Sequence, residues 1–191
     1  MSEPALTLHT DRLRLRTYQP SDAEALLPIY SREDVSRFLL GDPWTAEAAR
    51  TEVGKRLQRT GLSREAKALA LVIETDDDND AIAGSRVIGD IGIWLDGNDP
   101  TKAEIGWVLD PAASGHGFAS EAAIAVLNMA FDDCELRRVV AQMDARNTAS
   151  AKLAERIGMK REAHLRQDWW SKGEWTDTLV FAMLASDRVT A

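Results

Sequence analysis

Two glycines flank a histidine in the segment PAASGHGFASEA, residues 111–122, which leads directly into an alanine-rich stretch. Glycine has no Cβ atom, so Gly115 and Gly117 can adopt positive φ and let the backbone approach a ligand closely. The N–H groups of such a loop, with the positive end of a helix dipole, can bind a diphosphate without cationic side chains. A GxG pattern is also typical of a tight strand-to-helix connection, so both interpretations stay open at this point.

Other chemical patterns in the sequence are weaker. The loop lacks the Lys-Ser/Thr pair of a Walker motif and the third glycine of a dinucleotide-binding motif. Aspartates alternate at positions 76, 78 and 80 as in a calcium loop, but Ala81 replaces the required glycine and Val87 the bidentate glutamate. We therefore predict a solvated turn there, and no metal site. Cys134 has no histidine nearby in the sequence and is expected to be a small buried hydrophobe.

The composition is that of a folded protein of one domain, with 191 residues of which 45% are hydrophobic. The 23 Lys and Arg residues are outnumbered by 31 Asp and Glu, which gives a formal net charge of -8. This charge argues against sequence-independent binding to nucleic acid, because such binding depends on neutralising phosphates. It would attract cationic amines or peptides, although solubility is the simpler interpretation.

Charged residues and a single cysteine indicate where the protein resides. The first twenty residues contain five charged side chains and no continuous apolar core, so no secretory signal is predicted. No uncharged apolar run approaches the roughly 20 residues that a membrane-spanning helix needs. One cysteine cannot form an internal disulfide, which suits a reducing compartment. We expect a cytoplasmic protein.

The chain reads as one α/β (α+β) unit, with helices and strands distinguished by the spacing of apolar residues. A broken N-terminal strand is predicted over 6–18, and a helix interrupted by Pro28 over 21–40. Thr45 should cap the next helix and Gly61 should end it. The later elements are strands at 67–75, 86–96 and 102–110, a helix from Ala119, a strand at 137–145, a helix that starts at Asn147 and ends at Gly158, and a hairpin over 161–184 with its turn at 172–173.

An ordered set of motifs resembles the GNAT acetyltransferases. The motifs are TDRLRLR at 10–16, EIGWVLDP at 104–111, SGHGFASEA at 114–122, NTASAKLAERIGM at 147–159 and LRQDWWSKGEWTDTLVFAML at 165–184. More narrowly, they resemble the RimJ/RimL branch, which acetylates the N-terminal amines of proteins. The resemblance runs from about residue 10 to 187, and implies a mostly antiparallel central sheet of about seven strands flanked by about four helices.

The resemblance implies acetyl-CoA (coenzyme A) as the cofactor. The pantetheine arm is expected along the strand at Trp107, Val108 and Leu109, with Asn147 bonded to the arm and Lys152 near a nucleotide phosphate. Asn147 can also be a helix cap. The diphosphate is expected on the backbone amides of Ser114, Gly115, His116, Gly117, Phe118, Ala119 and Ser120.

The sequence departs from the family pattern at two positions. Ala112 stands where a Gln or Arg is often found, three residues before the first glycine. Ala154 stands where many members have a tyrosine acid, seven residues after the asparagine. The identity of the general acid is therefore open. Ser150, which matches the serine of the family's NxxS pattern, is either this acid or a helix-capping residue.

The resemblance implies direct attack of an amine on the thioester, with the oxyanion held by a backbone N–H near Trp107 or Val108. Glu104 is either a general base that acts through water or an exposed strand carboxylate. A peptide α-amine, with a pKa of about 7.7 to 8.0, costs about 1 kcal/mol to deprotonate at about pH 7, whereas a lysine costs roughly 4.6 kcal/mol. A weak base therefore suffices for a protein N-terminus.

The acceptor amine is left undecided by the sequence. Aromatic residues could line an acceptor groove, although ordinary packing explains at least half of them. The candidates are Phe38, Trp94, Trp169, Trp170 and Trp175. Two alternatives to a protein N-terminus stay open: a small amine such as an antibiotic or polyamine, and a non-catalytic regulatory protein that binds acyl-CoA. A homodimer formed through the hairpin or an edge strand is compatible with the pattern.

Overall fold

A computed structural model describes residues 6–63, 66–76 and 86–188. The aspartate-rich turn predicted around residues 76–85 lies almost entirely outside this part of the chain. The described residues form one mixed sheet of nine strands, in the order β1-β2-β4-β5-β6-β7-β9-β8 with the short β3 paired to β4. The strands are β1 (Thr7–His9), β2 (Leu13–Thr17), β3 (Thr60–Gly61), β4 (Ala68–Thr75), β5 (Val87–Leu95), β6 (Lys102–Leu109), β7 (Arg138–Asp144), β8 (Lys160–Ser171) and β9 (Glu174–Leu184).

Five α-helices accompany the sheet in the described ranges. They are α1 (Asp22–Tyr30), α2 (Glu33–Ser36), α3 (Ala46–Arg56), α4 (Phe118–Asn128) and α5 (Thr148–Arg156). The predicted α+β class is confirmed. The described residues contain more strands than predicted, because the N-terminal strand is two paired strands and β3 adds a short ninth one. They contain one more helix, because one predicted helix is divided into α1 and α2.

The N-terminal region differs from the sequence prediction in three details. The expected single broken strand folds back on itself, since β1 pairs antiparallel with β2 from Thr7 opposite Arg16 to His9 opposite Arg14. Pro28 does not interrupt α1, because the carbonyl left without its helical partner belongs to the exposed Glu24. Gly61 does not end α3, which stops at Arg56, and belongs to β3 instead.

The helix-end predictions at Thr45, Asn147 and Gly158 are confirmed. The Thr45 side chain accepts a hydrogen bond from the backbone N–H of Ala48 at the start of α3. The Asn147 side chain accepts one from the N–H of Ser150 at the start of α5, and Gly158 follows that helix with φ of +90°. The C-terminal hairpin turns at Lys172 and Gly173, both with positive φ, as expected for a tight two-residue turn.

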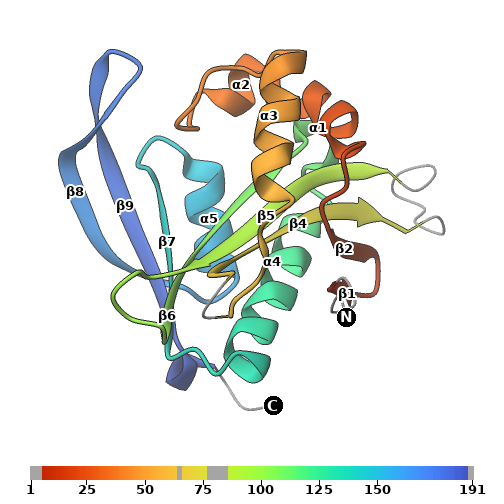
Figure 1. Ribbon diagram of the computed structural model, residues 1–191. Helices are drawn as coiled ribbons and strands as arrows, with labels where there is room; N and C mark the ends of the chain where they lie inside the picture. The colour runs from red at the N-terminus through yellow and green to blue at the C-terminus, as the bar shows by residue number, and fades with distance from the viewer. Residues whose placement is uncertain (1–5, 64–65, 77–85, 189–191) are drawn as a thin grey trace.

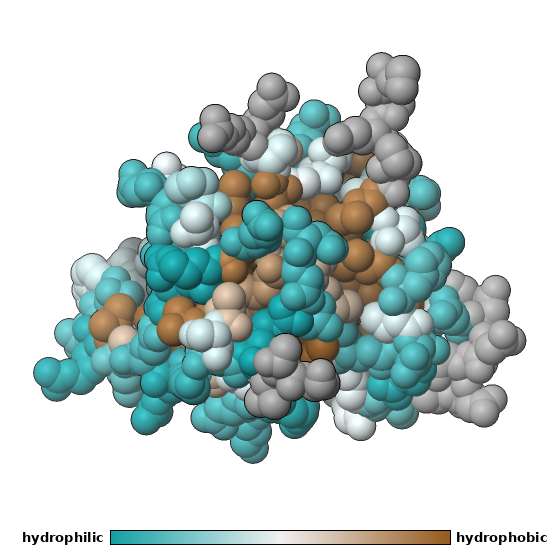
Figure 2. All heavy atoms as spheres, turned by 90° about the horizontal axis from the view of Figure 1, so that it is seen from below, coloured by the Kyte–Doolittle hydropathy of each residue, from teal (hydrophilic) through white to brown (hydrophobic). Residues whose placement is uncertain are grey.

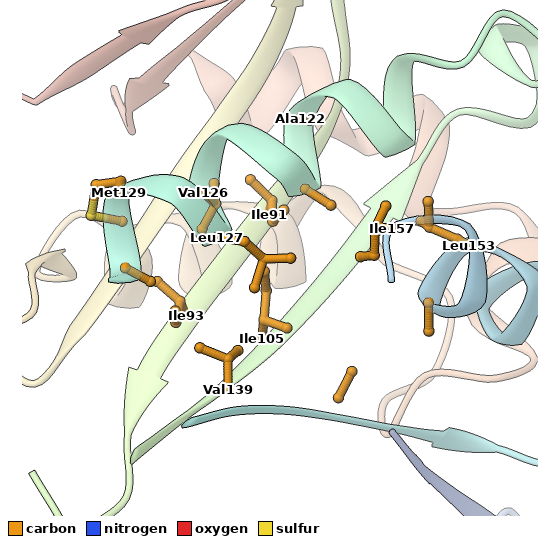
Figure 3. Close-up of a cluster of buried hydrophobic side chains, with 14 of the residues drawn as sticks. Ile91, Ile93, Ile105, Ala122, Val126, Leu127, Met129, Val139, Leu153 and Ile157 are labelled. Carbon is orange, nitrogen blue, oxygen red and sulfur yellow. The ribbon is translucent and has the colours of Figure 1, made fainter. Parts of the chain in front are cut away.

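The two faces of the sheet are covered differently (Figure 1). On one face α4 and α5 cover a large apolar cluster, in which Ile91, Ile93 and Ile105 meet Val126 and Leu127 (Figure 3). On the other face α1 and α3 cover a smaller cluster. Viewed from below, apolar atoms gather within a rim of hydrophilic residues (Figure 2). No helix in the described ranges is both long and apolar enough to cross a membrane.

Strands β6 and β7 separate in the middle of the sheet. They run parallel and pair only from Lys102 opposite Arg138 to Glu104 opposite Val140, although β6 continues to Leu109 and β7 to Asp144. Beyond Glu104 the two strands diverge, while each stays paired to its other neighbour. We call this region the splay. The sheet is thus opened at one place, at the ends of the strands that lead to α4 and α5.

Candidate functional site

The glycine loop has the predicted backbone geometry. Gly115 and Gly117 have φ of +85° and +82°, and Gly117 is the N-cap residue of α4. A Cβ atom at Gly115 would meet nothing within 4 Å, so it is the positive φ that requires glycine there, and not crowding. Positive φ at two alternate residues is typical of a concave backbone that presents N–H groups to an anion. His116 is exposed, and its ring stacks on Phe118 with centroids 5.5 Å apart.

The loop is braced by an arginine that sequence reasoning missed. Arg12, in the turn between β1 and β2, donates from Nη1 to the His116 carbonyl at 3.0 Å and from Nε to Glu121 at 2.8 Å. Glu121, in the first turn of α4, also accepts from the Thr10 hydroxyl at 2.6 Å. Burial raises the pKa of Glu121, but these hydrogen bonds outweigh it and the net pKa is lowered. The only available signal was that Arg12 belongs to the TDRLRLR motif.

A second cation lies beside the start of α4. Arg156 of α5 has its Nη1 at 3.5 Å from the Ser120 hydroxyl. Lys152, the residue predicted near a phosphate, is exposed one helical turn before Arg156. Residues four apart share one face of a helix, so α5 presents both cations on the same side.

The backbone of β6 faces the splay at alternate residues. Asp110 N donates to Ile88 O at 2.8 Å, and Asp96 N donates to Lys102 O at 2.8 Å. Antiparallel pairs alternate between those that exchange hydrogen bonds and those that do not. Even-numbered residues of β6 therefore bond to β5, and the N–H and C=O groups of Trp107 and Leu109 face the splay. By the same alternation, the backbone of Val108, which was predicted to bind the pantetheine arm, faces its partner Asp90 in β5 and not the splay.

Two polar side chains, those of Asn147 and Ser150, lie at the start of α5 beside the splay. The Trp107 indole N–H donates to the Ser150 Oγ at 3.3 Å, and Asn147 Oδ1 accepts from the Ser150 backbone N–H. In the described residues neither the Ser150 hydroxyl nor the Asn147 amide donates a hydrogen bond to another group. Ala154, at the position of the family's tyrosine, is fully buried. Ser150 is therefore the hydroxyl that α5 brings to Trp107.

Glu104 lies where the splay begins. It forms the last parallel pair of β6 with β7, and its carboxylate accepts a hydrogen bond from Gln142 Nε2 at 3.0 Å. Burial raises the pKa of Glu104, and the smaller effects of Gln142 and Lys102 oppose the increase. The carboxyl is thus half-buried rather than an ordinary exposed strand residue. A carboxylate with a raised pKa is a better proton acceptor than a solvated one.

The predicted acceptor residues fall into two groups. Trp94 pairs with Glu104 and lies on the same face of the sheet, the one that α1 and α3 partly cover. Phe38 follows α2 on that side, where Lys172 of the hairpin tip donates to the Ser36 carbonyl. We call the uncovered part of this surface the acceptor face.

The structure does not bring all the tryptophans together. Trp170 and Trp175 pack on each other with centroids 5.4 Å apart. Trp175 shares its face of β9 with Leu179 and Phe181, which pack in the α4 and α5 cluster. Only Trp169, which pairs with Thr176, points from the hairpin to the same side as Trp94.

A sheet opened beside a glycine loop and a helix N-terminus is the arrangement of an acetyltransferase fold. The model of the acetyltransferase (GNAT) domain matches residues 12–160, so the chain belongs to the GNAT family of N-acetyltransferases. Over 178 residues the chain is 28% identical to the uncharacterized N-acetyltransferase p20 of Bacillus licheniformis, covering 93% of this chain and 96% of the relative.

Solved structures agree with this assignment. A GNAT acetyltransferase from Bacillus anthracis superposes with a TM-score of 0.80 and 28% identity, over 95% of this chain and 99% of the other. RimL, a ribosomal L7/L12 α-N-protein acetyltransferase solved with coenzyme A, has a TM-score of 0.79 over 94% of this chain and 98% of its own. Its identity is 19%, so this likeness concerns the fold alone.

The residues present fit coenzyme A, the cofactor that GNAT acetyltransferases use. Gly115 leaves open space just before α4, and a Cβ atom at Gly117 would lie 3.5 Å from Nη2 of Arg12, so backbone N–H groups and a cation meet where a diphosphate needs donors. The free backbone groups of Trp107 and Leu109 match the amide groups of a pantetheine arm. The Asn147 side-chain amide, whose N–H groups donate to nothing else in the described residues, follows β7 and so lies across the splay from β6.

Proposed function

We propose that this protein transfers the acetyl group of acetyl-CoA to the N-terminal α-amine of a protein or peptide. The observation that carries the proposal is the position of Glu104, a half-buried carboxylate with a raised pKa at the start of the splay. Such a base is strong enough for an amine that is already partly neutral at physiological pH. The likeness to RimL supports a protein N-terminus as acceptor.

The cofactor would be held mainly by backbone. Amides of residues 114–120 would bind the diphosphate at the α4 N-terminus, with Arg12 and Arg156 adding positive charge nearby. The carbonyl of Trp107 and the backbone of Leu109 would bond the pantetheine arm as a neighbouring strand does, and Asn147 would donate to it. Acetyl-CoA supplies an activated acyl carbon to the amine.

Two residues of the chain would handle the proton transfers. Glu104 would accept a proton from the acceptor ammonium or amine at its carboxylate oxygens, directly or through one water. The free N–H of Trp107 would donate to the acyl oxygen, where negative charge develops. The Ser150 hydroxyl, which accepts a hydrogen bond from Trp107, keeps its own proton for the departing sulfur. A thiol with a pKa of about 8.5 needs little such help at neutral pH, so the buried Ala154 is no obstacle.

The function is tested by thiol release from acetyl-CoA with a panel of amines. A peptide with a free N-terminus should react at least about a hundredfold faster, in kcat/KM at pH 7, than the same peptide with a blocked N-terminus and an internal lysine, because the deprotonation costs differ by about 3 to 4 kcal/mol. Polyamines and aminoglycosides complete the panel. A preference for one of these small amines contradicts the proposal, and binding of coenzyme A without any thiol release supports a regulatory protein instead.

A further inference from the structure

The face of the sheet that carries Trp94 and Glu104 is covered by α1 and α3 at one end and is open at the other, where it forms the acceptor face. Asp90 of β5 and Val108 of β6 form a pair that lies beneath the α1 and α3 cluster, where Asp90 is 6% exposed. The next pair on this face is Gly92 opposite Gly106, and the pair after it is Trp94 opposite Glu104. The cover therefore ends at two residues without side chains. The sheet would be bare there, next to the splay.

The indole of Trp94 fills this bare area. A Cβ atom at Gly106 would be 3.2 Å from Cη2 of the Trp94 ring, and one at Gly92 would be 3.8 Å from Cζ3. The ring thus lies across both glycines, and their lack of side chains is what lets it lie close to the sheet. Trp94 nevertheless remains 39% exposed. It is an apolar floor with an open surface.

The floor adjoins the groups proposed to carry the chemistry. Trp94 is the cross-strand partner of Glu104, and its ring reaches the residue before Trp107, whose N–H faces the splay. An amine nitrogen bound between Glu104 and the splay would bring the group on its neighbouring carbon to this ring, because the ring lies directly beside Glu104. Gly92 and Gly106 offer no side-chain donor or acceptor, so a polar group there would lose water without a replacement partner.

We propose that Trp94 selects the acceptor, favouring amines whose neighbouring carbon carries an apolar group. The inference rests on the proposed function and specifies its substrate class: peptides that begin with Leu or Met are better acceptors than peptides that begin with Ser or Gly. Contact of roughly 50 Å² of apolar surface with the ring corresponds to a preference of about fivefold to tenfold. Trp170 and Trp175, equally aromatic and more exposed, lie on the other face and take no part.

The test compares kcat/KM for peptides that differ only in the first residue, with the wild-type protein and three variants. The wild type should prefer Leu over Ser by about fivefold to tenfold. Trp94→Ala should abolish this ratio, and Gly106→Ala should reduce it because the added methyl displaces the ring. Trp170→Ala is the matched control and should keep the wild-type ratio. The affinity for coenzyme A, which a general folding defect would lower, should stay unchanged in Trp94→Ala.

Two results overturn the proposal: a wild type without the apolar preference, or a Trp94→Ala protein that keeps it. If Trp94→Ala does not fold, Trp94→Phe decides, because a smaller ring should give an intermediate ratio. If no peptide is acetylated, the proposed function fails, yet the role of Trp94 is still measurable. Butylamine and 2-methoxyethylamine then replace the peptides. A butylamine preference in kcat/KM that is larger in the wild type than in Trp94→Ala supports the apolar floor, and an equal preference in both proteins rejects it.

Discussion

The two faces of the central sheet are constructed by different means. On the face covered by α4 and α5, the interior is apolar and the candidate cofactor groups are mostly backbone: the glycine loop, the α4 N-terminus and the free edge of β6. On the face covered by α1 and α3, side chains dominate, with buried ion pairs at one end and Trp94 and Glu104 at the other. Under the proposed function, the cofactor would be bound mainly through backbone conformation, whereas the acceptor would be selected by side chains.

The buried charges of the second face give the largest expected effect. Asp90 accepts hydrogen bonds from the Tyr30 hydroxyl at 2.8 and 2.9 Å and from Arg56 Nη1 at 3.0 Å, and the Tyr18 hydroxyl also donates to it. Burial and the neighbouring Asp90 charge raise the pKa of both tyrosines well above the usual value, so their hydroxyls stay protonated donors. Asp90→Asn leaves Arg56 without its counter-charge, and should lower the free energy of unfolding by about 3 kcal/mol in chemical denaturation.

Asp34→Asn is the matched control for this prediction. It makes the same change in an ion pair, with Arg32, in which Asp34 is 60% exposed. Exposed pairs contribute little, so its unfolding free energy should change by less than about 0.5 kcal/mol. Equal effects of the two substitutions would mean that the α1 and α3 side does not depend on its buried charges, and the contrast between the two faces would disappear.

Glu104 should give the next largest effect, on turnover. Glu104→Gln should lower kcat by about tenfold or more and leave the affinity for coenzyme A unchanged, because it removes the proton acceptor and keeps the shape. The pH profile shows this loss specifically. A neutral amine is needed at all pH values, so log kcat/KM should rise with a slope of about one below the amine pKa, and with a slope of about two below the raised pKa of Glu104.

A general base works only when it is deprotonated, so the contribution of Glu104 to kcat/KM is lost as the pH falls through its pKa. Glu104→Gln should therefore keep a slope of about one throughout the acid range. Glu162→Gln is the control. Glu162 lies on the exposed edge strand β8 and pairs with Arg138 of β7, so this variant should keep the wild-type pH profile. A Glu104→Gln protein with the same slopes as the wild type removes Glu104 from the chemistry.

How much the sequence could predict depends on how far apart the interacting residues lie in the chain. The glycine loop, the Asn147 cap and the hairpin turn depend on residues close together in the chain, where Gly, Asn and apolar spacing have local physical causes. These predictions are confirmed in the structure. The family resemblance added the cofactor and the direction of the chemistry.

The contacts that the sequence could not predict join distant residues. Arg12 reaches His116 across 104 positions, and Trp94 overlies Gly106 only because the register of β5 and β6 makes them neighbours. Local patterns do not fix register, so Trp94, Trp170 and Trp175 appeared equivalent although they lie on opposite faces. Likewise, only the ladder between β5 and β6 shows that the N–H of Trp107, and not that of Val108, faces the splay.

The smallest effect is expected at the glycine loop, where it tests the backbone half of the comparison. Gly117 has φ of +82°, a conformation that costs an L-residue about 1 kcal/mol. An alanine would let the loop of the free protein relax to another φ, and binding would have to restore the strained one, so Gly117→Ala should weaken coenzyme A binding by about fivefold in calorimetry. Gly54→Ala, within α3 where a Cβ atom meets nothing within 4 Å, should leave that affinity unchanged. If Gly117→Ala binds as tightly as the wild type, the loop backbone does not hold the diphosphate. Arg12 and Arg156 would then be its main ligands, and side chains would govern both faces.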